Sequence, residues 1–346
     1  MWHQIATPRH AKIKMNPVYT SDAYLRNKAI HERTCAEIVR PKRMYAVINN
    51  TDNSVQLMSK TTLAQFHITS FMEPGQRFAS DNKKERFINQ WLEDPDRLVC
   101  RSVVVDPTLP VGPSVRGFNL WPGFAASSIP AVLATDVDTL LRPIILHIDE
   151  VYAGQSAGKR EWILNWFAHN VQFPGRRHGV AIVIHGEPET GRGVLGKFHR
   201  MVTGADVSYH AMFCKKYQHL ESVLNGDAMQ AFVQMKRQPK LHKRASALLA
   251  KRTVEFKQKY FGSTYVQNLT NLYITTQDQG GDSGVDSFTD EKFAVFTARP
   301  TYKDNHPYFN QLWEQLRRPE VQRAWFQYLM ARDLSQFAPG SLPPTV

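Results

Sequence analysis

The sequence has few cysteines, no long apolar run and fewer acidic than basic residues, and each shortage excludes a class of protein. The three cysteines, Cys35, Cys100 and Cys214, form no CxxC pair, which argues against a disulfide framework and a cysteine-based zinc site. No stretch of about 18 apolar residues is present, so no membrane span is predicted. The first 21 residues lack the apolar core of a signal peptide. We expect an intracellular, reducing location, and the basic start of the chain leaves a virion or organelle association open.

The excess of basic residues indicates a polyanionic partner. The chain carries 43 Lys and Arg against 31 Asp and Glu, a net charge of +12. The stretch from Met235 to Lys259 holds nine of these basic residues and one acid. Its candidate nucleic-acid contacts are Lys236, Arg237, Lys240, Lys243, Arg244, Lys251 and Arg252. The nearby aromatics Tyr260, Phe261 and Tyr265 can stack on exposed bases, although core packing is the commoner role of any one of them.

Hydrophobic periodicity predicts an α/β protein, because apolar strands alternate with amphipathic helices. A β-hairpin followed by a helix is expected over 43–66, a helix over 159–173, a strand over 180–184 and a helix from 194. A long basic helical region is expected over 217–259, then buried strands at 271–277 and 292–298, and a helical end. We divide the chain into a basic tail (1–40), a small α+β region (41–125) and a larger domain (126–346).

The stretch "VAIVIHGEPETGRGVLGKF" from Val180 to Phe198 passes from an apolar strand through a glycine-rich turn into a helix. This context is typical of a phosphate-binding P-loop, in which backbone N–H groups point at phosphate. One frame opens at Gly186 and closes at Gly191, and another opens at Gly191 and closes at Gly196. The first is favoured because its loop begins where the strand ends. It gives the candidate nucleotide-binding residues Gly186, Thr190, Gly191, Arg192, Gly193 and Val194.

This loop departs from a working P-loop at the two positions that carry chemistry. Arg192 stands where lysine is expected, and a rigid guanidinium replaces a compact ammonium. Val194 has no oxygen for magnesium. Nucleotide binding can survive these changes, whereas hydrolysis should suffer; the alternative is a glycine turn that binds nothing. Asp149 and Glu150 end an apolar run as an acidic P-loop strand would, but they precede the loop, so a structural or surface role is expected.

Several segments together resemble a known family. They are "INQWLEDPDRLVCRSVVVDP", "FNLWPGF", "ILNWFAHNVQFPGRRHGVAIVIHG", "VQNLTNLYITTQ", "YFNQLWEQL" and "RDLSQF". In order and spacing they resemble the helicase part of phage, plasmid and mobile-element primase-helicases, which are superfamily 3 helicases of the AAA+ class. The resemblance implies an AAA+-like P-loop NTPase core, in which helices flank a central, mostly parallel sheet, with a small α+β N-terminal region and a helical C-terminal end.

The resemblance also implies ATP and magnesium as cofactors and a homo-oligomer in the form of a hexameric ring. Residue by residue, however, its chemical positions have changed. The loop lysine and threonine fall on Arg192 and Val194. The acidic strand falls on "AFVQMKRQ", with Met235 and Lys236 where Asp and Glu belong, unless Asp206, Glu221 or Asp227 serve instead. The sensor asparagine falls on Gln277 and the arginine finger on Lys292.

Three functions remain open from the sequence. The favoured one is a nucleic-acid-binding protein of a virus or mobile element that acts in genome replication on single-stranded DNA, with ATP hydrolysis lost or weak. An active ATP-dependent DNA helicase with an atypical loop is the second, and a structural or assembly protein that reuses the fold is the third. A separate primase or polymerase is expected as a partner. No resident metal site is predicted, because His178, His185 and His199 lack ligand spacing.

Overall fold

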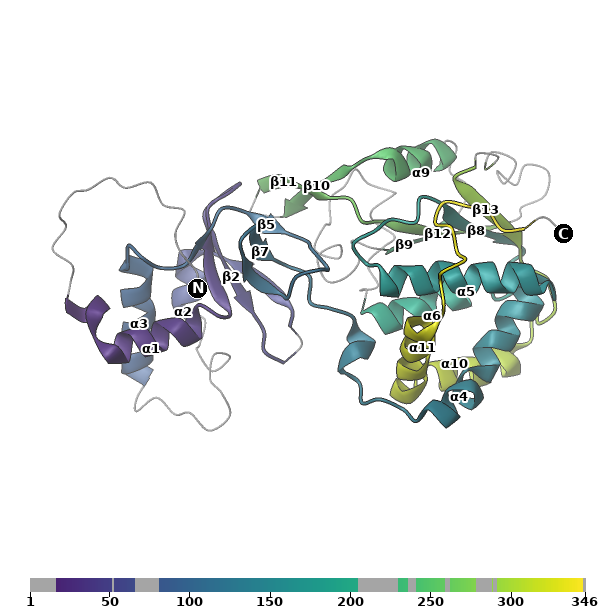
Figure 1. Cartoon of the computed structure of the whole chain (residues 1–346), viewed down its shortest axis with the longest axis horizontal. Coiled ribbons are helices and arrows are strands. Elements are labelled where there is room, and N and C mark those ends of the chain that lie inside the picture. The colour runs from purple at the N-terminus through teal and green to yellow at the C-terminus, as the bar shows by residue number, and fades with distance from the viewer. Residues whose placement is uncertain are drawn as a thin grey trace.

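The chain folds into two lobes that lie side by side (Figure 1). The structure is a computed structural model that describes residues 17–51, 53–65, 81–204, 230–235, 241–258, 262–277, 288 and 291–344. Helices and strands occur in both lobes, which gives the mixed α/β architecture that the sequence predicts. Among the described helices, none is both long and apolar enough to span a bilayer.

The smaller lobe contains a four-stranded sheet with helices on one face. The sheet has the order β3 (Val55–Met58), β2 (Met44–Ile48), β1 (Cys35–Ile38) and β4 (Val99–Cys100). The other elements on this side are η1 (Pro17–Thr20), α1 (Asp22–His31), α2 (Lys60–Gln65) and α3 (Asp81–Glu93). The expected hairpin and helix over 43–66 are present as β2, β3 and α2. Because β1 pairs with both β2 and β4, the sheet extends across the boundary expected at residue 40.

Two apolar clusters hold this lobe together, one on each face of the sheet. The helical face buries Tyr24, Leu63 and Trp91. The other face buries Ile38, Met44 and Cys100, among others, against a small sheet of order β5 (Val103–Val104), β7 (Gly117–Asn119) and β6 (Gly112–Ser114).

The larger lobe is organised around a four-stranded parallel sheet. Its order is β13 (Phe293–Thr297), β8 (Ala181–Gly186), β12 (Asn271–Gln277) and β9 (Gln230–Met235). All three neighbouring pairs are parallel, so the carboxyl ends of the four strands lie at one edge. The burial of β8 is nearly continuous, as expected for a strand covered on both faces.

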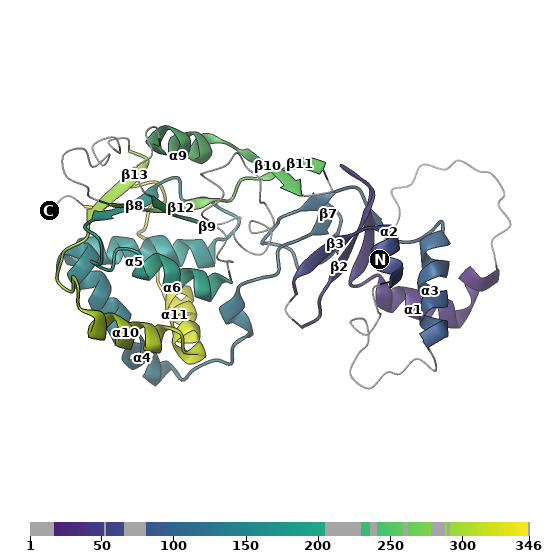
Figure 2. The same ribbon diagram turned by 180° about the vertical axis from the view of Figure 1, so that it is seen from behind.

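Helices cover this sheet on two sides, as Figure 2 shows from behind. One apolar cluster involves η3 (Ala125–Ser128), α4 (Ala134–His147), η4 (Ile148–Ala153), α5 (Ala157–Gln172), α6 (Val194–Thr203), α10 (His306–Leu316) and α11 (Pro319–Ala331). Its fully buried side chains include Trp166 and Trp325. A second cluster joins α9 (Leu241–Ala250) to β12 and β13. The helical C-terminal end and the central parallel sheet therefore agree with the expected architecture.

Two sequence interpretations need correction. The run Ile144–Glu150 is helical, spanning the end of α4 and the π-helical turn η4, because a short apolar run of this length suits a helix as well as a strand. The region 217–259 is not one long helix: its described parts are β9, α9 and β10 (Thr253–Gln258). The strand β10 pairs in antiparallel fashion with β11 (Gly262–Gln267).

Candidate functional site

The glycine-rich loop lies at the carboxyl edge of the parallel sheet, between β8 and α6. Gly186 ends β8, and a Cβ atom there would lie 2.9 Å from the Ala298 Cβ. Only glycine therefore lets the end of β8 approach the segment after β13 this closely. The side chain of Thr190 is buried and its Oγ1 donates to the Glu187 carbonyl at 3.0 Å. Gly193 caps α6, and Val194 is its first residue. The six candidate residues thus span the end of β8, the loop and the first residue of α6.

The end of α4 and the turn η4 hold the loop through Gly191. The Tyr152 hydroxyl donates to the Gly191 carbonyl at 2.7 Å and accepts from the Leu195 N–H at 3.3 Å. His147 places Nε2 3.3 Å from the same carbonyl. Because a carbonyl only accepts, this contact assigns the proton to Nε2, and Nδ1 then accepts from the Tyr308 hydroxyl at 2.9 Å.

His147 is neutral in this position. It is fully buried, and burial lowers its pKa to about 4, against a smaller opposite effect of the hydrogen bond to Gly191. Its ring stacks beside Tyr308 and Tyr302, whose own rings are parallel at 3.7 Å between centroids. The Tyr302 hydroxyl in turn donates to the Glu150 carboxylate. A chain of hydrogen bonds and stacked rings therefore supports the loop from a side that the sequence did not indicate.

Arg192 bends back onto the loop instead of extending from it. Its Nη1 donates to the carbonyl of Gly186 at 3.2 Å and to the carbonyl of Glu187. Burial lowers the pKa of this guanidinium. Its backbone carbonyl accepts from the Tyr273 hydroxyl of β12 at 3.0 Å. The arginine therefore stabilises the loop internally, through one guanidinium nitrogen that donates to two carbonyls.

The backbone N–H groups in the second half of the loop are left without an acceptor among the described residues. Over the part of the chain that the structure describes, no hydrogen bond has the N–H of residues 189–193 as its donor. Glu189 and Gly191 both have positive φ, at 62° and 86°, and such left-handed residues turn successive N–H groups toward one side. Successive N–H groups beside a helix N-terminus favour an anion such as phosphate. The loop therefore fits an anionic group better than a cation.

The neighbouring strand ends meet the loop at the same edge. In the parallel register Gln277 is opposite Gly186, and Thr276 is opposite both His185 and Met235. The candidate sensor residue and the end of the candidate acidic strand therefore lie in line with the start of the loop. Lys236, Asp206, Glu221 and Asp227 lie outside the described residues. Lys292 precedes β13 at the amino edge, where its carbonyl accepts from the Ala181 N–H at 2.8 Å, so it is not near the loop.

The two positions at which the resemblance implies magnesium ligands carry side chains of the wrong chemistry. Val194 is aliphatic and buried, and Met235 ends β9 where a carboxylate is expected. Hard cations require oxygen ligands. In the described ranges, no group of three or more His, Cys, Asp or Glu side chains is placed to hold a metal. Glu187, the carboxylate nearest in sequence to the loop start, pairs with Lys303. The residues present therefore do not fit magnesium.

The candidate nucleic-acid residues fall around α9 and the β10–β11 hairpin. Lys236, Arg237, Lys240, Tyr260 and Phe261 lie outside the described residues. Lys243 and Arg244 are on α9, while Lys251 and Arg252 are exposed between α9 and β10. On β11, Tyr265 is 72% exposed, which favours a surface role over the core packing that the sequence left open.

The base of this hairpin is held firmly by two side chains that sequence reasoning missed. Arg177 Nη1 donates to the carbonyls of Leu249 and Lys251, both at 2.8 Å. Asn268 Nδ2 donates to the carbonyls of Leu248 and Lys251, at 2.8 and 2.9 Å. These bonds satisfy carbonyl groups at the end of α9, which have no partner within the helix, and they fix where β10 begins. Their partners are 17–74 residues away in the chain, so no local signal indicates them.

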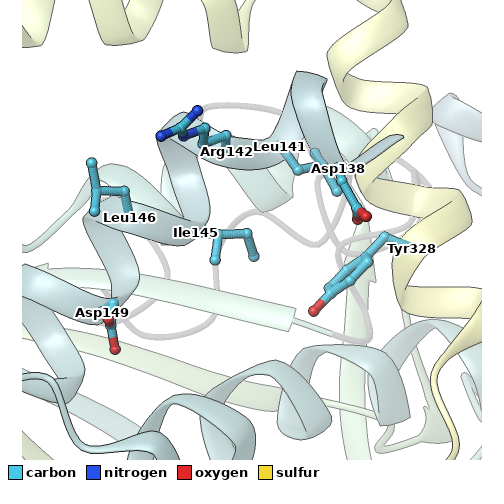
Figure 3. Close-up of a pocket in the computed structure, with 7 residues that line it drawn as sticks. All are labelled: Asp138, Leu141, Arg142, Ile145, Leu146, Asp149 and Tyr328. Atoms are coloured by element: carbon cyan, nitrogen blue, oxygen red, sulfur yellow. The ribbon is translucent and has the colours of Figure 1, made fainter. Parts of the chain in front are cut away.

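A separate pocket of about 430 Å³ opens between α4, η4 and α11. Figure 3 shows Leu141, Arg142, Ile145 and Leu146 on the helix that also carries Asp138, with Tyr328 reaching in from α11. Its remaining lining residue, Asp149, is paired with Arg160 at 3.4 Å. The pocket shares no residue with the glycine-rich loop, and the sequence did not predict it.

Comparisons with known proteins give a fold but not a family. No family model and no curated protein matches the sequence. Two solved structures with a similar fold are apo forms of the C-terminal region of NrS-1. One has 14% identity and a TM-score of 0.63 and covers 91% of this chain and 71% of that chain. The other has 15% identity and a TM-score of 0.63, with 95% and 73% covered. At this identity the likeness extends to the fold alone.

Proposed function

We propose that the protein is a nucleic-acid-binding replication protein of a virus or mobile element, with an AAA+-like P-loop core that has lost most or all ATP hydrolysis. One observation carries this proposal: the glycine-rich loop and the ends of β9 and β12 meet at one sheet edge, yet Val194 and Met235 replace the magnesium ligands. In the superfamily 3 resemblance the acidic strand and the sensor strand follow the loop in the chain. Here β9 and β12 follow the loop in that order. The resemblance also supports the link to replication.

The loop would hold a nucleotide through its phosphates. The N–H groups of residues 189–193 have no acceptor among the described residues, and the Arg192 guanidinium adds a positive charge at the start of the loop, on the carbonyls of Gly186 and Glu187. If ATP binds, its cleavage would still need an activated water and charge neutralisation by a metal. Because Met235 supplies no carboxylate and Val194 no hydroxyl, binding without efficient turnover follows.

The nucleic-acid contact would come from the basic region around the β10–β11 hairpin. Lys251 and Arg252 are exposed where α9 passes into β10, and the Arg177 and Asn268 bonds hold them in place. Tyr265 offers an exposed ring for stacking. Basic side chains that follow the phosphates, combined with aromatic rings, are the usual means of binding single strands without sequence preference.

Steady-state ATP hydrolysis in the presence of magnesium is the first test. We expect turnover no higher than that of an Arg192→Ala variant, whether or not single-stranded DNA is added. A fluorescent ATP analogue should bind the wild-type protein equally well in magnesium and in EDTA, because no side chain at the loop holds the metal. The thermal midpoint of Arg192→Ala must be compared with wild type, since this arginine also stabilises the loop.

The other two functions predict different results in the same assay. DNA-stimulated turnover that Arg192→Ala abolishes would establish the active helicase and overturn the proposal. Absence of both nucleotide and DNA binding would favour the structural or assembly protein.

Reversing charge at four basic positions tests the nucleic-acid contact. In the variant Lys243→Glu, Arg244→Glu, Lys251→Glu, Arg252→Glu, single-stranded DNA binding should weaken for all sequences. The slope of log affinity against log salt should fall by about 3, because each phosphate contact to a single strand contributes roughly 0.7. Fluorescence anisotropy of a labelled oligonucleotide over a salt series measures both. An unchanged slope would remove this segment from the binding surface.

A further inference from the structure

A second basic surface lies on the smaller lobe, in the turn that joins β1 to β2. Arg40, Lys42 and Arg43 are exposed in this turn. Arg101, directly after β4, is also exposed, and its carbonyl accepts from the Arg40 N–H at 3.0 Å. The pairing of β1 with both β2 and β4 therefore gathers four basic side chains from two parts of the chain at one end of the sheet.

Only one of these four cations has a carboxylate partner within the ranges that the structure describes. Arg43 pairs with the buried carboxylate of Glu37 at 2.7 Å, so it has a structural role. Over the same ranges, Arg40, Lys42 and Arg101 take part in no ion pair. Like charges held close together repel, and a polyanion would relieve that repulsion.

The smaller lobe contacts the base of the β10–β11 hairpin through the apolar cluster beneath its sheet. Val254 of β10 packs against the apolar cluster that contains Ile38, Met44 and Cys100. These three residues flank the basic turn and Arg101 in the chain. Val254 also contacts the cluster of α9 and β12 in the larger lobe, so it lies at the junction of the lobes. Figure 1 shows the hairpin extending from the larger lobe toward the smaller one.

We infer that Arg40, Lys42 and Arg101 extend the hairpin surface into one track for the phosphates of single-stranded DNA. The inference rests on the proposed function, because it presupposes that the segment around Lys251 and Arg252 binds DNA. A single strand would then cross from one lobe to the other over Val254. The track would require a longer strand than the hairpin alone, since its two ends are on different lobes.

The test compares three variants by fluorescence anisotropy over a salt series, with labelled thymidine oligonucleotides of about 5 and 20 nucleotides. The first neutralises the turn: Arg40→Gln, Lys42→Gln, Arg101→Gln. The second neutralises the hairpin base: Lys251→Gln, Arg252→Gln. The third is a control with the same charge change as the first, at exposed positions on α1, α2 and the end of α10: Arg26→Gln, Lys60→Gln, Arg317→Gln.

For the long oligonucleotide, the turn variant should lower the salt slope by about 2, so that wild type loses about 16-fold more affinity than the variant between 50 and 200 mM salt. The short oligonucleotide should show no such difference, and the control should resemble wild type with both. If the turn triple misfolds, Lys42→Gln alone, whose side chain forms no hydrogen bond or ion pair with the described residues, should give about a third of the slope change.

The remaining outcomes separate the two proposals. If the hairpin variant weakens binding and the turn variant matches the control, the track is overturned and the proposed function stands. If wild type shows no salt-dependent binding to either oligonucleotide, both are overturned.

Discussion

Lowering the pH from 7.5 to 5 is expected to remove most of the stability of the fold. Five histidines are nearly or fully buried, and burial lowers the pKa of His31, His147 and His169 to about 4 and of His178 and His199 to about 3. Below the unfolded pKa of about 6.5, only the unfolded chain takes up these protons, so stability falls as pH falls. At pH 5 each buried histidine lowers the free energy of unfolding by about 2 kcal/mol, and the four in the larger lobe, His147, His169, His178 and His199, together approach the total stability of a typical domain.

The loss of stability in this pH window comes from histidine, because the carboxylates do not produce it. Burial raises the pKa of Glu32, so the folded chain takes up its proton first and stability there rises as pH falls. Burial raises the pKa of Asp94, but hydrogen bonds from Lys28 and Tyr24 outweigh it, and the net effect is a lowered pKa. Such a carboxylate protonates only in more acidic solution, since an ordinary Asp titrates near 4. Loss of structure between pH 6.5 and 5, followed by circular dichroism and urea midpoints, therefore reports on the buried imidazoles.

His178 offers the sharpest control. Burial lowers its pKa first, and the neighbouring His169 adds to the effect. Neither ring nitrogen has a hydrogen-bond partner among the described residues. The ring centroids of Trp166 and Phe337 lie 5.6 and 5.2 Å from the centroid of the His178 ring. Between pH 7.5 and 5, the free energy of unfolding of His178→Phe should fall by about 2 kcal/mol less than that of wild type. The exposed control His306→Gln should show the same dependence of stability on pH as wild type. If His178→Phe also loses as much stability as wild type between pH 7.5 and 5, His178 is not a source of the loss.

The elements that the sequence predicted well are those whose signals are local. The strand at 180–184, the glycine turn and the helix from Val194 follow one another in 20 residues, and the structure has β8, the loop and α6 there. The strands at 271–277 and 292–298 are apolar runs between turn residues, and both are present. Buried parallel strands read as continuous apolar runs, so little context is needed to recognise them.

What the sequence did not reveal depends on distant partners. The hydroxyl of Tyr152 reaches the loop across 39 residues, and Tyr273 bonds to Arg192 across 81. Nothing within a local window indicates such contacts, because they arise only when the sheet forms. The β10–β11 hairpin was missed for a different reason: its charged side chains obscure the alternation of Val254 and Phe256, so the region was interpreted as helical.

Replacing Gly191 by alanine is expected to destabilise the larger lobe by about 3 kcal/mol, because two costs coincide. The residue has φ of +86°, which an alanine adopts only with strain. A Cβ atom there would also lie 2.6 Å from His147 Cε1 and 2.8 Å from Phe309 Cε1, both on elements that support the loop. Urea unfolding followed by tryptophan fluorescence measures the change, since Trp162, Trp166 and Trp325 report on this lobe.

Two other glycines separate strain from overlap in this prediction. Gly123 has φ of +94°, and a Cβ atom there would meet nothing within 4 Å, so Gly123→Ala should show the strain alone, about 1–2 kcal/mol. Gly193, the cap of α6, has negative φ and would meet only Lys197 Cε at 3.8 Å, so Gly193→Ala should cost less than about 1 kcal/mol. If Gly191→Ala costs no more than Gly123→Ala, the loop is not packed against His147 and Phe309, and the support that we assign to α4 and α10 is wrong. If it costs more, the excess measures how rigidly those helices hold the carbonyl of Gly191, and with it the direction of the N–H groups on which any anion would depend.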